Sequence, residues 1–285
     1  MRPVKRTGAL TMPSIGLSSI AGAPGVTTLA LAMSYTATTS TLIVEADTSR
    51  SSAILSGYFQ GTVAPDRGIL ELAMKSSTHR LEPKDLWEEV LQIDSDGRQY
   101  LMPGLYDPTA AKGIDHTVWS TLGDWTRTMS GGVTPIIDFG RLSPQDRRQG
   151  LLTSVSHLAI VCQATLPNVL ALQGALAFLD ELLPPDMIDS RLGLILVEQP
   201  GIVNYSDREI AHRIGVPVWG RVKHDLKTAM AFSHHTRDLA ESRADRRKAI
   251  RKSPLLRSAQ SLHASIKARD ERDAQIVTPE GADAL

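Results

Sequence analysis

Short runs of β-branched and aliphatic residues alternate with helical patterns along most of this 285-residue chain. The predicted strands cover residues 14–20, 42–45, 99–102, 134–138, 158–163, 193–197 and 216–220. The predicted helices lie between them, over residues 27–37, 69–75, 85–92, 118–129, 146–154, 170–183 and 207–214. Such alternation is typical of an α/β fold, in which each helix returns the chain to the same edge of a sheet. We therefore expect seven strands in one mostly parallel sheet with helices on both faces.

The alternation contains no linker and no internal repeat, so residues 14–235 are predicted to form one domain behind an N-terminal tail, residues 1–13. Two C-terminal helices are expected over residues 236–273. The second begins at Ser253 and Pro254, an N-cap serine followed by proline at the first helical position. Its apolar residues recur at helical spacing, which predicts that it lies on the domain: Leu255, Ala259, Leu262 and Ile266. The small, polar residues 274–285 are predicted to be disordered.

Composition excludes several classes of protein. Lys plus Arg number 31 and balance 31 Asp plus Glu, so no overall field attracts nucleic acid or membrane. The only cysteine, Cys162, lies in an apolar run and is expected to be a buried thiol, which fits a cytoplasmic protein. No apolar stretch approaches the roughly 20 residues that cross a bilayer, and the N-terminus does not resemble a signal peptide. We expect no membrane insertion.

The most informative segment is a small-residue loop between the first predicted strand and the first predicted helix. Such a turn directs free backbone N–H groups and the positive end of a helix at one point, which suits a phosphate. The loop resembles the deviant Walker A motif of the ParA/MinD family of P-loop ATPases, Lys-Gly-Gly-x-Gly-Lys-Thr-Thr. Four residues match the motif: Gly22, Gly25, Thr27 and Thr28. The resemblance implies that the whole loop binds nucleotide through Gly22, Ala23, Pro24, Gly25, Val26, Thr27 and Thr28.

Both lysines of the motif are replaced. Ala21 stands where the family has the lysine that reaches across a dimer, and Val26 stands where it has the lysine on the β- and γ-phosphates. Losing the second lysine removes a contact that contributes about 1.5 to 3 kcal/mol. The resemblance therefore implies weakened binding of ATP or ADP with Mg²⁺ and little or no hydrolysis. The alternative is a tight turn between strand and helix that binds nothing.

Two acidic strand ends extend the resemblance. Residues 42–47 resemble the second strand of the family, which ends in Asp-x-Asp: Asp47 matches the second acid and Glu45 replaces the first. The resemblance makes Asp47 the residue that positions the attacking water, if the protein is active. Residues 135–140 resemble the Walker B strand, so Asp138 is expected to hold Mg²⁺ through water while Thr27 offers it a hydroxyl. Carboxylates at the ends of parallel strands converge on one crevice. Solvated strand-end acids are the alternative.

The resemblance continues downstream and covers roughly residues 14 to 232. A strand over 193–197, a helix starting near Tyr205 and the segment 214–220 follow the family in order. Where the family has proline before the next acidic turn, this chain has Lys223 and His224, which offers another route for a basic group to the nucleotide.

Other kinds of site fit less well. A Rossmann dinucleotide site would use two loop glycines and Glu45, but it has no use for the paired threonines or for Asp138. His224, His234 and His235 lack the partners of a metal cluster and are interpreted as surface residues. Nucleophilic catalysis has no candidate, because no nucleophile elbow occurs.

One dense basic patch lies near residue 250. Its charge pattern predicts a nonspecific DNA contact or simply a solvated helix face, and four of its residues are expected to govern any DNA affinity: Arg246, Arg247, Arg251 and Lys252.

The resemblance implies a homodimer that positions a cargo, such as a plasmid, chromosome region, pilus or secretion machine, through a protein partner or cargo adaptor. Two classes remain open: an ATP-operated partition switch, or a pseudo-ATPase scaffold similar to the TadZ/CpaE-type members that place Tad pilus machinery.

Overall fold

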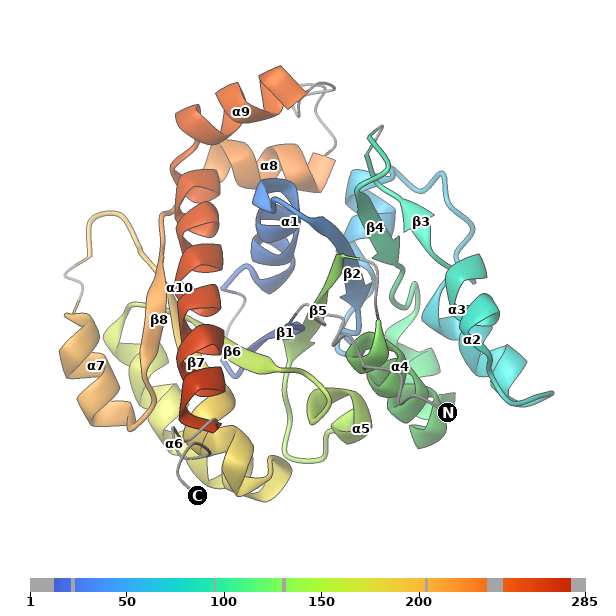
Figure 1. Ribbon diagram of the computed structural model, residues 1–285, viewed down its shortest axis with the longest axis horizontal. Helices are drawn as coiled ribbons and strands as arrows, with labels where there is room; N and C mark the ends of the chain where they lie inside the picture. Colours follow the sequence, from blue (N-terminus) through green and yellow to red (C-terminus); the bar gives the residue numbers. More distant parts are fainter. Residues whose placement is uncertain are drawn as a thin grey trace, which may run out of the picture.

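A computed structural model shows one eight-stranded sheet covered by helices on both faces (Figure 1). It describes residues 13–21, 24–94, 96–129, 132–202, 205–234 and 243–277. The strand order is β3-β4-β2-β5-β1-β6-β7-β8. Every pairing is parallel except that between β3 and β4. The strands are β1 (Ile15–Ser19), β2 (Ser40–Glu45), β3 (Leu91–Gln92), β4 (Gln99–Met102), β5 (Val133–Arg141), β6 (His157–Gln163), β7 (Leu192–Val197) and β8 (Val218–Val222).

The helices follow the predicted alternation. They are α1 (Val26–Thr36), α2 (Ile69–Ser76), α3 (Pro83–Glu88), α4 (His116–Thr128), α5 (Gln149–Leu152), α6 (Leu166–Leu182), α7 (Asp207–Ile214), α8 (Leu226–His234), α9 (Arg243–Lys252) and α10 (Pro254–Val277). Short π-helical or 3₁₀ segments lie at Ile54–Tyr58, Pro108–Gly113 and Met187–Arg191. The expected α/β fold is confirmed, with one strand more than predicted.

The extra strand replaces the end of a predicted helix. A capping box between Glu82 and Asp85 starts α3 earlier than expected, and α3 ends at Glu88. The chain then pairs Leu91 and Gln92 antiparallel with β4. A two-residue strand carries no periodicity of its own, so the pattern of this segment resembled a continued helix.

Side chains of each central strand point alternately into two cores, as the pleat of a β-strand requires. Leu42 and Val44 of β2 belong to the core beneath α4 and α6, whereas Ile43 belongs to the core beneath α1 and α10. The thiol of Cys162 is buried in β6, as predicted, and burial raises its pKa to about 11. In the described part of the chain, helices therefore cover both faces of the central strands.

The long helix α10 lies across the sheet face on the side of α1, as Figure 1 shows in red. The Ser253 hydroxyl accepts a hydrogen bond from the Leu256 amide at 3.1 Å, which confirms the predicted cap. All four predicted apolar contacts are buried: Leu255, Ala259, Leu262 and Ile266. The helix ends at Val277, past the predicted start of the tail at residue 274. No helix in the described ranges has the length and apolarity needed to cross a bilayer.

Candidate functional site

The predicted phosphate loop joins the central strand β1 to α1. Gly22 and Ala23 lie outside the described residues. Gly25 is the N-cap of α1 and has φ of 92°, a left-handed conformation that glycine adopts without strain. A glycine cap has no side chain to occupy the first N–H groups of the helix, so these groups and the helix dipole can serve an anion. The backbone of the described half of the loop thus suits the predicted phosphate site.

The lysine position of the loop is part of the core. The Val26 side chain is 1% exposed and packs in the apolar cluster beneath α1 and α10. Pro24 is also buried, whereas Ala21 and Thr28 are partly exposed. Residue 26, where the resemblance places a lysine, thus contributes packing and no positive charge.

Asp138 lies at the centre of the sheet edge. In β5 it is paired with Leu17 of β1 and with Glu45 of β2. The register between β1 and β5 shifts just after Asp138, and such irregularities commonly redirect a strand beside an active site. The Asp138 side chain is fully buried, and its Oδ1 accepts a hydrogen bond from the Gly140 amide at 2.8 Å.

The other oxygen of Asp138 is available to a ligand. Burial raises the pKa of this carboxyl to about 6, while the nearby Thr27 hydroxyl and the Gly140 amide lower it. Among the described residues no group donates to the buried Oδ2 in hydrogen-bonding geometry. A buried carboxylate oxygen without a partner is costly, and Mg²⁺ prefers oxygen ligands such as this one and a threonine hydroxyl. Asp138 and Thr27 therefore fit the predicted Mg²⁺ site.

Glu45 has a structural role instead. Its Oε2 accepts hydrogen bonds from the Ser52 hydroxyl at 2.5 Å and from the Gly104 amide at 3.2 Å. A side chain at residue 104 would collide with the backbone of Glu45, at 2.5 Å from its carbonyl oxygen. Burial, with a smaller contribution from the neighbouring Asp138, raises the pKa of Glu45 to about 7, although the Ser52 and Gly104 hydrogen bonds oppose the rise. The glutamate, one methylene longer than the family's aspartate, joins β2 to the loop after β4.

Asp47 lies at the site but its oxygens are occupied. They accept hydrogen bonds from the amide and hydroxyl of Ser49 at 2.8 and 2.6 Å, and from Nε of Arg50 at 2.9 Å. The carboxyl contacts the Cα of Gly140, where a side chain would meet the Asp47 Cγ at 2.0 Å. The Gly140 amide thus donates to Asp138, and the absence of a side chain at residue 140 leaves space for the Asp47 carboxyl.

Arg148 is a site residue that the sequence did not reveal. Its buried guanidinium pairs with Asp146 and donates to the carbonyl of Ala46 at 2.7 Å and to that of Arg141 at 3.0 Å. It also lies over the Phe139 ring, 5.5 Å from the ring centre. The side chain thereby fastens the chain after β2 to the chain after β5. These contacts hold residues 146–148 outside the predicted helix, which shortens to α5.

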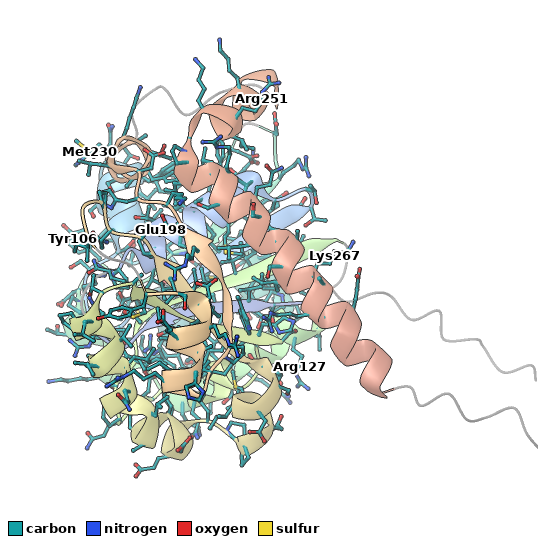
Figure 2. The ribbon with its side chains drawn as sticks, turned by 90° about the vertical axis from the view of Figure 1, so that its left-hand side faces the viewer. Tyr106, Arg127, Glu198, Met230, Arg251 and Lys267 are labelled. Carbon is teal, nitrogen blue, oxygen red and sulfur yellow. The ribbon has the colours of Figure 1, made fainter. Side chains whose placement is uncertain are left out.

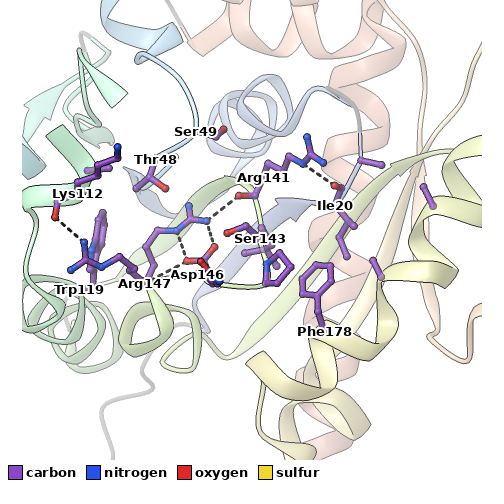
Figure 3. A pocket seen from close by; sticks show the side chains of 18 of the residues that line it. Ile20, Thr48, Ser49, Lys112, Trp119, Arg141, Ser143, Asp146, Arg147 and Phe178 are labelled. Atoms are coloured by element: carbon purple, nitrogen blue, oxygen red, sulfur yellow. Dashed lines mark hydrogen bonds and ion pairs between the residues drawn. The ribbon is translucent and has the colours of Figure 1, made fainter. Parts of the chain in front are cut away.

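Two pockets flank the loop. The smaller, of about 160 Å³, is lined by Gly25, Thr27, Thr28, Leu31, Arg50, Ala53, Ile54, Phe232 and Ser233. The larger, of about 770 Å³, lies on the other side between Ala21, the chain after β5 and α6 (Figure 3). In it, Arg141 points toward the loop and donates to the carbonyl of Ile20 at 3.0 Å.

The remaining sequence candidates lie away from this edge or are occupied. Lys223 pairs with Glu198 at 2.6 Å. In the described ranges no three His, Cys, Asp or Glu residues are grouped as metal ligands would be; His235 lies outside those ranges. Arg251 and Lys252 are exposed on α9, which projects at one end of the molecule (Figure 2). The side chains of Arg246 and Arg247 are outside the described set, and DNA contact by this patch stays a prediction.

Comparison with known proteins supports the fold that the resemblance implied. No family model matches the chain, and no curated protein matches its sequence. Its structure is similar to that of a ParA family ATPase from Chlorobium tepidum TLS, with a TM-score of 0.66 and 19% identity over 87% of this chain and 97% of that one. The septum site-determining protein MinD of Pyrococcus horikoshii OT3 gives a TM-score of 0.61 and 15% identity over 94% and 99%. A Cyanothece McdA gives a TM-score of 0.62 and 16% identity over 90% of this chain and 97% of that one.

Identities of this size establish the fold alone. The mostly parallel sheet with helices on both faces agrees with that result. The chain has the fold of the ParA/MinD-type P-loop ATPases.

Proposed function

We propose that this is a cytoplasmic, ParA/MinD-like positioning protein that binds ATP or ADP with Mg²⁺ weakly and hydrolyses ATP very slowly or not at all. The observation that carries the proposal is the buried Oδ2 of Asp138, beside Thr27 at the start of α1, to which no described residue donates in hydrogen-bonding geometry. A turn with a purely structural role would have no need for this oxygen, whereas a Mg²⁺-nucleotide would complete its contacts.

Similar structures support nucleotide binding. The Pyrococcus horikoshii MinD was solved in complex with Mg-ADP, and the Cyanothece McdA variant in complex with ATP. In this chain, the helix N-terminus would bind phosphate and Asp138 would hold the metal. The role of Asp47 in positioning water is opposed by its contacts with Ser49 and Arg50, which leave little of the carboxylate for water. Absence of both loop lysines also opposes hydrolysis, because no charge from them can stabilise the transferring phosphoryl group.

The cargo-positioning part of the proposal is based on the same likeness. An Aquifex aeolicus MinD was solved with the cell division protein MinC, and a Borrelia burgdorferi neighbour is a putative plasmid partition protein. We propose that this protein likewise acts as a homodimer through a protein partner. A pseudo-ATPase scaffold needs only the bound state, and for that reason we favour it over a cycling partition switch.

Calorimetric titration of the wild-type protein with ATP, with and without Mg²⁺, tests the nucleotide site. We expect Kd values in the micromolar to millimolar range with Mg²⁺ present, and about a tenfold or greater loss for Asp138→Asn. Glu45→Gln is the matched control, because it changes the buried acid on the neighbouring strand whose oxygen already has partners. Equal Mg²⁺-ATP affinity of Asp138→Asn and wild type would contradict the site.

A phosphate-release assay tests the pseudo-ATPase part separately. We expect no turnover above background, with or without added partner. A turnover that disappears in Asp47→Ala would show an active ATPase and would favour the partition switch.

A further inference from the structure

The smaller pocket beside the loop is lined by one positively charged side chain. Its lining residues include Gly25, Thr27 and Thr28 from the start of α1, and Arg50 from the chain after β2. Among the described residues that line this pocket, Arg50 alone carries a charge. The guanidinium thus lies next to the backbone at which a phosphate would bind.

Arg50 has N–H groups that its contact with Asp47 does not use. Its Nε pairs with Asp47 at 2.9 Å, and the side chain is 47% exposed. In the described part of the chain, no hydrogen bond is made by either of its terminal nitrogens. A guanidinium presents five N–H donors in a planar fork, so one N–H can hold a carboxylate while others bind phosphate oxygens.

The other cations near the loop are less suitable. Arg141 lines the larger pocket on the side of Ala21, and that lining does not include Gly25, Thr27 or Thr28. Lys223 forms an ion pair with Glu198. Arg50 also lies close enough to Asp138 for its charge to offset a small part of the rise that burial causes in the pKa of that carboxyl.

We propose that Arg50 is the phosphate-binding cation of this protein and replaces, from the chain after β2, the charge that the loop lost at Val26. This inference depends on the proposed nucleotide binding. It makes the loop and the chain after β2 interdependent: the same arginine that holds Asp47 binds the triphosphate of ATP. The positive charge is then supplied by the chain after β2 and not by the loop.

The test is calorimetric titration of the full chain with ATP and Mg²⁺. Because a charged donor to phosphate is lost, we expect Arg50→Ala to weaken binding about 10- to 100-fold and Arg50→Lys to weaken it less. Arg127→Ala is the matched control, as Arg127 also pairs with an aspartate three residues away and lies near the end of α4, which does not line the smaller pocket. It should bind ATP as wild type does.

A second variant separates phosphate binding from a structural effect through Asp47. Asp47→Asn removes the charge that Arg50 pairs with, and we expect ATP affinity to stay equal or rise. If Arg50→Ala binds ATP as tightly as a binding-competent wild type, or if Asp47→Asn loses as much affinity as Arg50→Ala, the role of Arg50 is refuted while nucleotide binding stands. A wild type that binds no ATP would refute both.

Discussion

The candidate site has two walls, which differ in how far they match the nucleotide site that the resemblance implies. The wall made by the ends of β2 and β5 keeps its acids, with Asp138 buried and Asp47 held in place by hydrogen bonds. The wall made by the loop before α1 keeps its backbone geometry at Gly25 but has an aliphatic residue in the core at Val26. A buried acid without a purpose is costly, whereas a lost cation costs only ligand affinity. The acid wall therefore matches the expected Mg²⁺ site more fully than the loop wall matches the expected phosphate site.

Removing Arg148 should have the largest effect, and it should act on the acid wall. Arg148→Ala leaves the carboxylate of Asp146 buried without its partner and frees the carbonyls of Ala46 and Arg141. Breaking a buried ion pair on one side typically costs about 3 to 5 kcal/mol. We expect a loss of that size in the free energy of unfolding, measured by urea denaturation.

Hydrogen exchange would show which segments Arg148→Ala destabilises. Protection should fall in the segments after β2 and β5, which Arg148 joins, and should be retained in α1. Equal loss of protection in α1 and in these segments would show that the two walls are one unit, and the comparison between them would not hold.

Arg148 also shows where sequence reasoning reached its limit. The alternation of strands and helices was readable because each strand has aliphatic side chains on both faces, as Leu42, Ile43 and Val44 do. The site acids were found because they end such strands. Arg148 contacts backbone carbonyls of segments that are distant in the sequence, and backbone contacts leave no residue pattern. The structural role of Glu45 was equally hidden, because its partners are the Ser52 hydroxyl and the Gly104 amide.

The second prediction distinguishes the two acids of β2 and β5 by pH. The pKa of Glu45 is raised from 4.5 to about 7 in the folded protein, so between these values the native state binds more protons than the unfolded state. Stability must then fall as pH rises from about 4.5 to 7. A shift of this size corresponds to about 3 kcal/mol. Glu45→Gln cannot ionise and should lack this part of the fall, measured by urea denaturation across that pH range.

The pH dependence of Mg²⁺-ATP binding tests the second buried acid, Asp138. Metal binding requires the charged form of Asp138, whose pKa is raised to about 6, so Mg²⁺-ATP affinity should rise as pH increases through that value in wild type and in Glu45→Gln alike. Identical pH profiles of stability for wild type and Glu45→Gln would show that Glu45 is not the buried acid that titrates.

The smallest expected effect comes from restoring charge to the loop wall. Val26→Lys places an amino group next to the phosphate position, and a charge-assisted contact contributes about 1.5 to 3 kcal/mol, or one to two decades of ATP affinity. Because Val26 is 1% exposed, the lysine stem must pack in the core while its amino group extends to the pocket, and the ligand-free variant should unfold at lower urea. Val26→Lys combined with Arg50→Ala should recover the affinity that Arg50→Ala alone loses, since one cation then serves for the other. If Val26→Lys folds but gains no affinity for ATP, the loop wall is structural, and the scaffold would act without nucleotide.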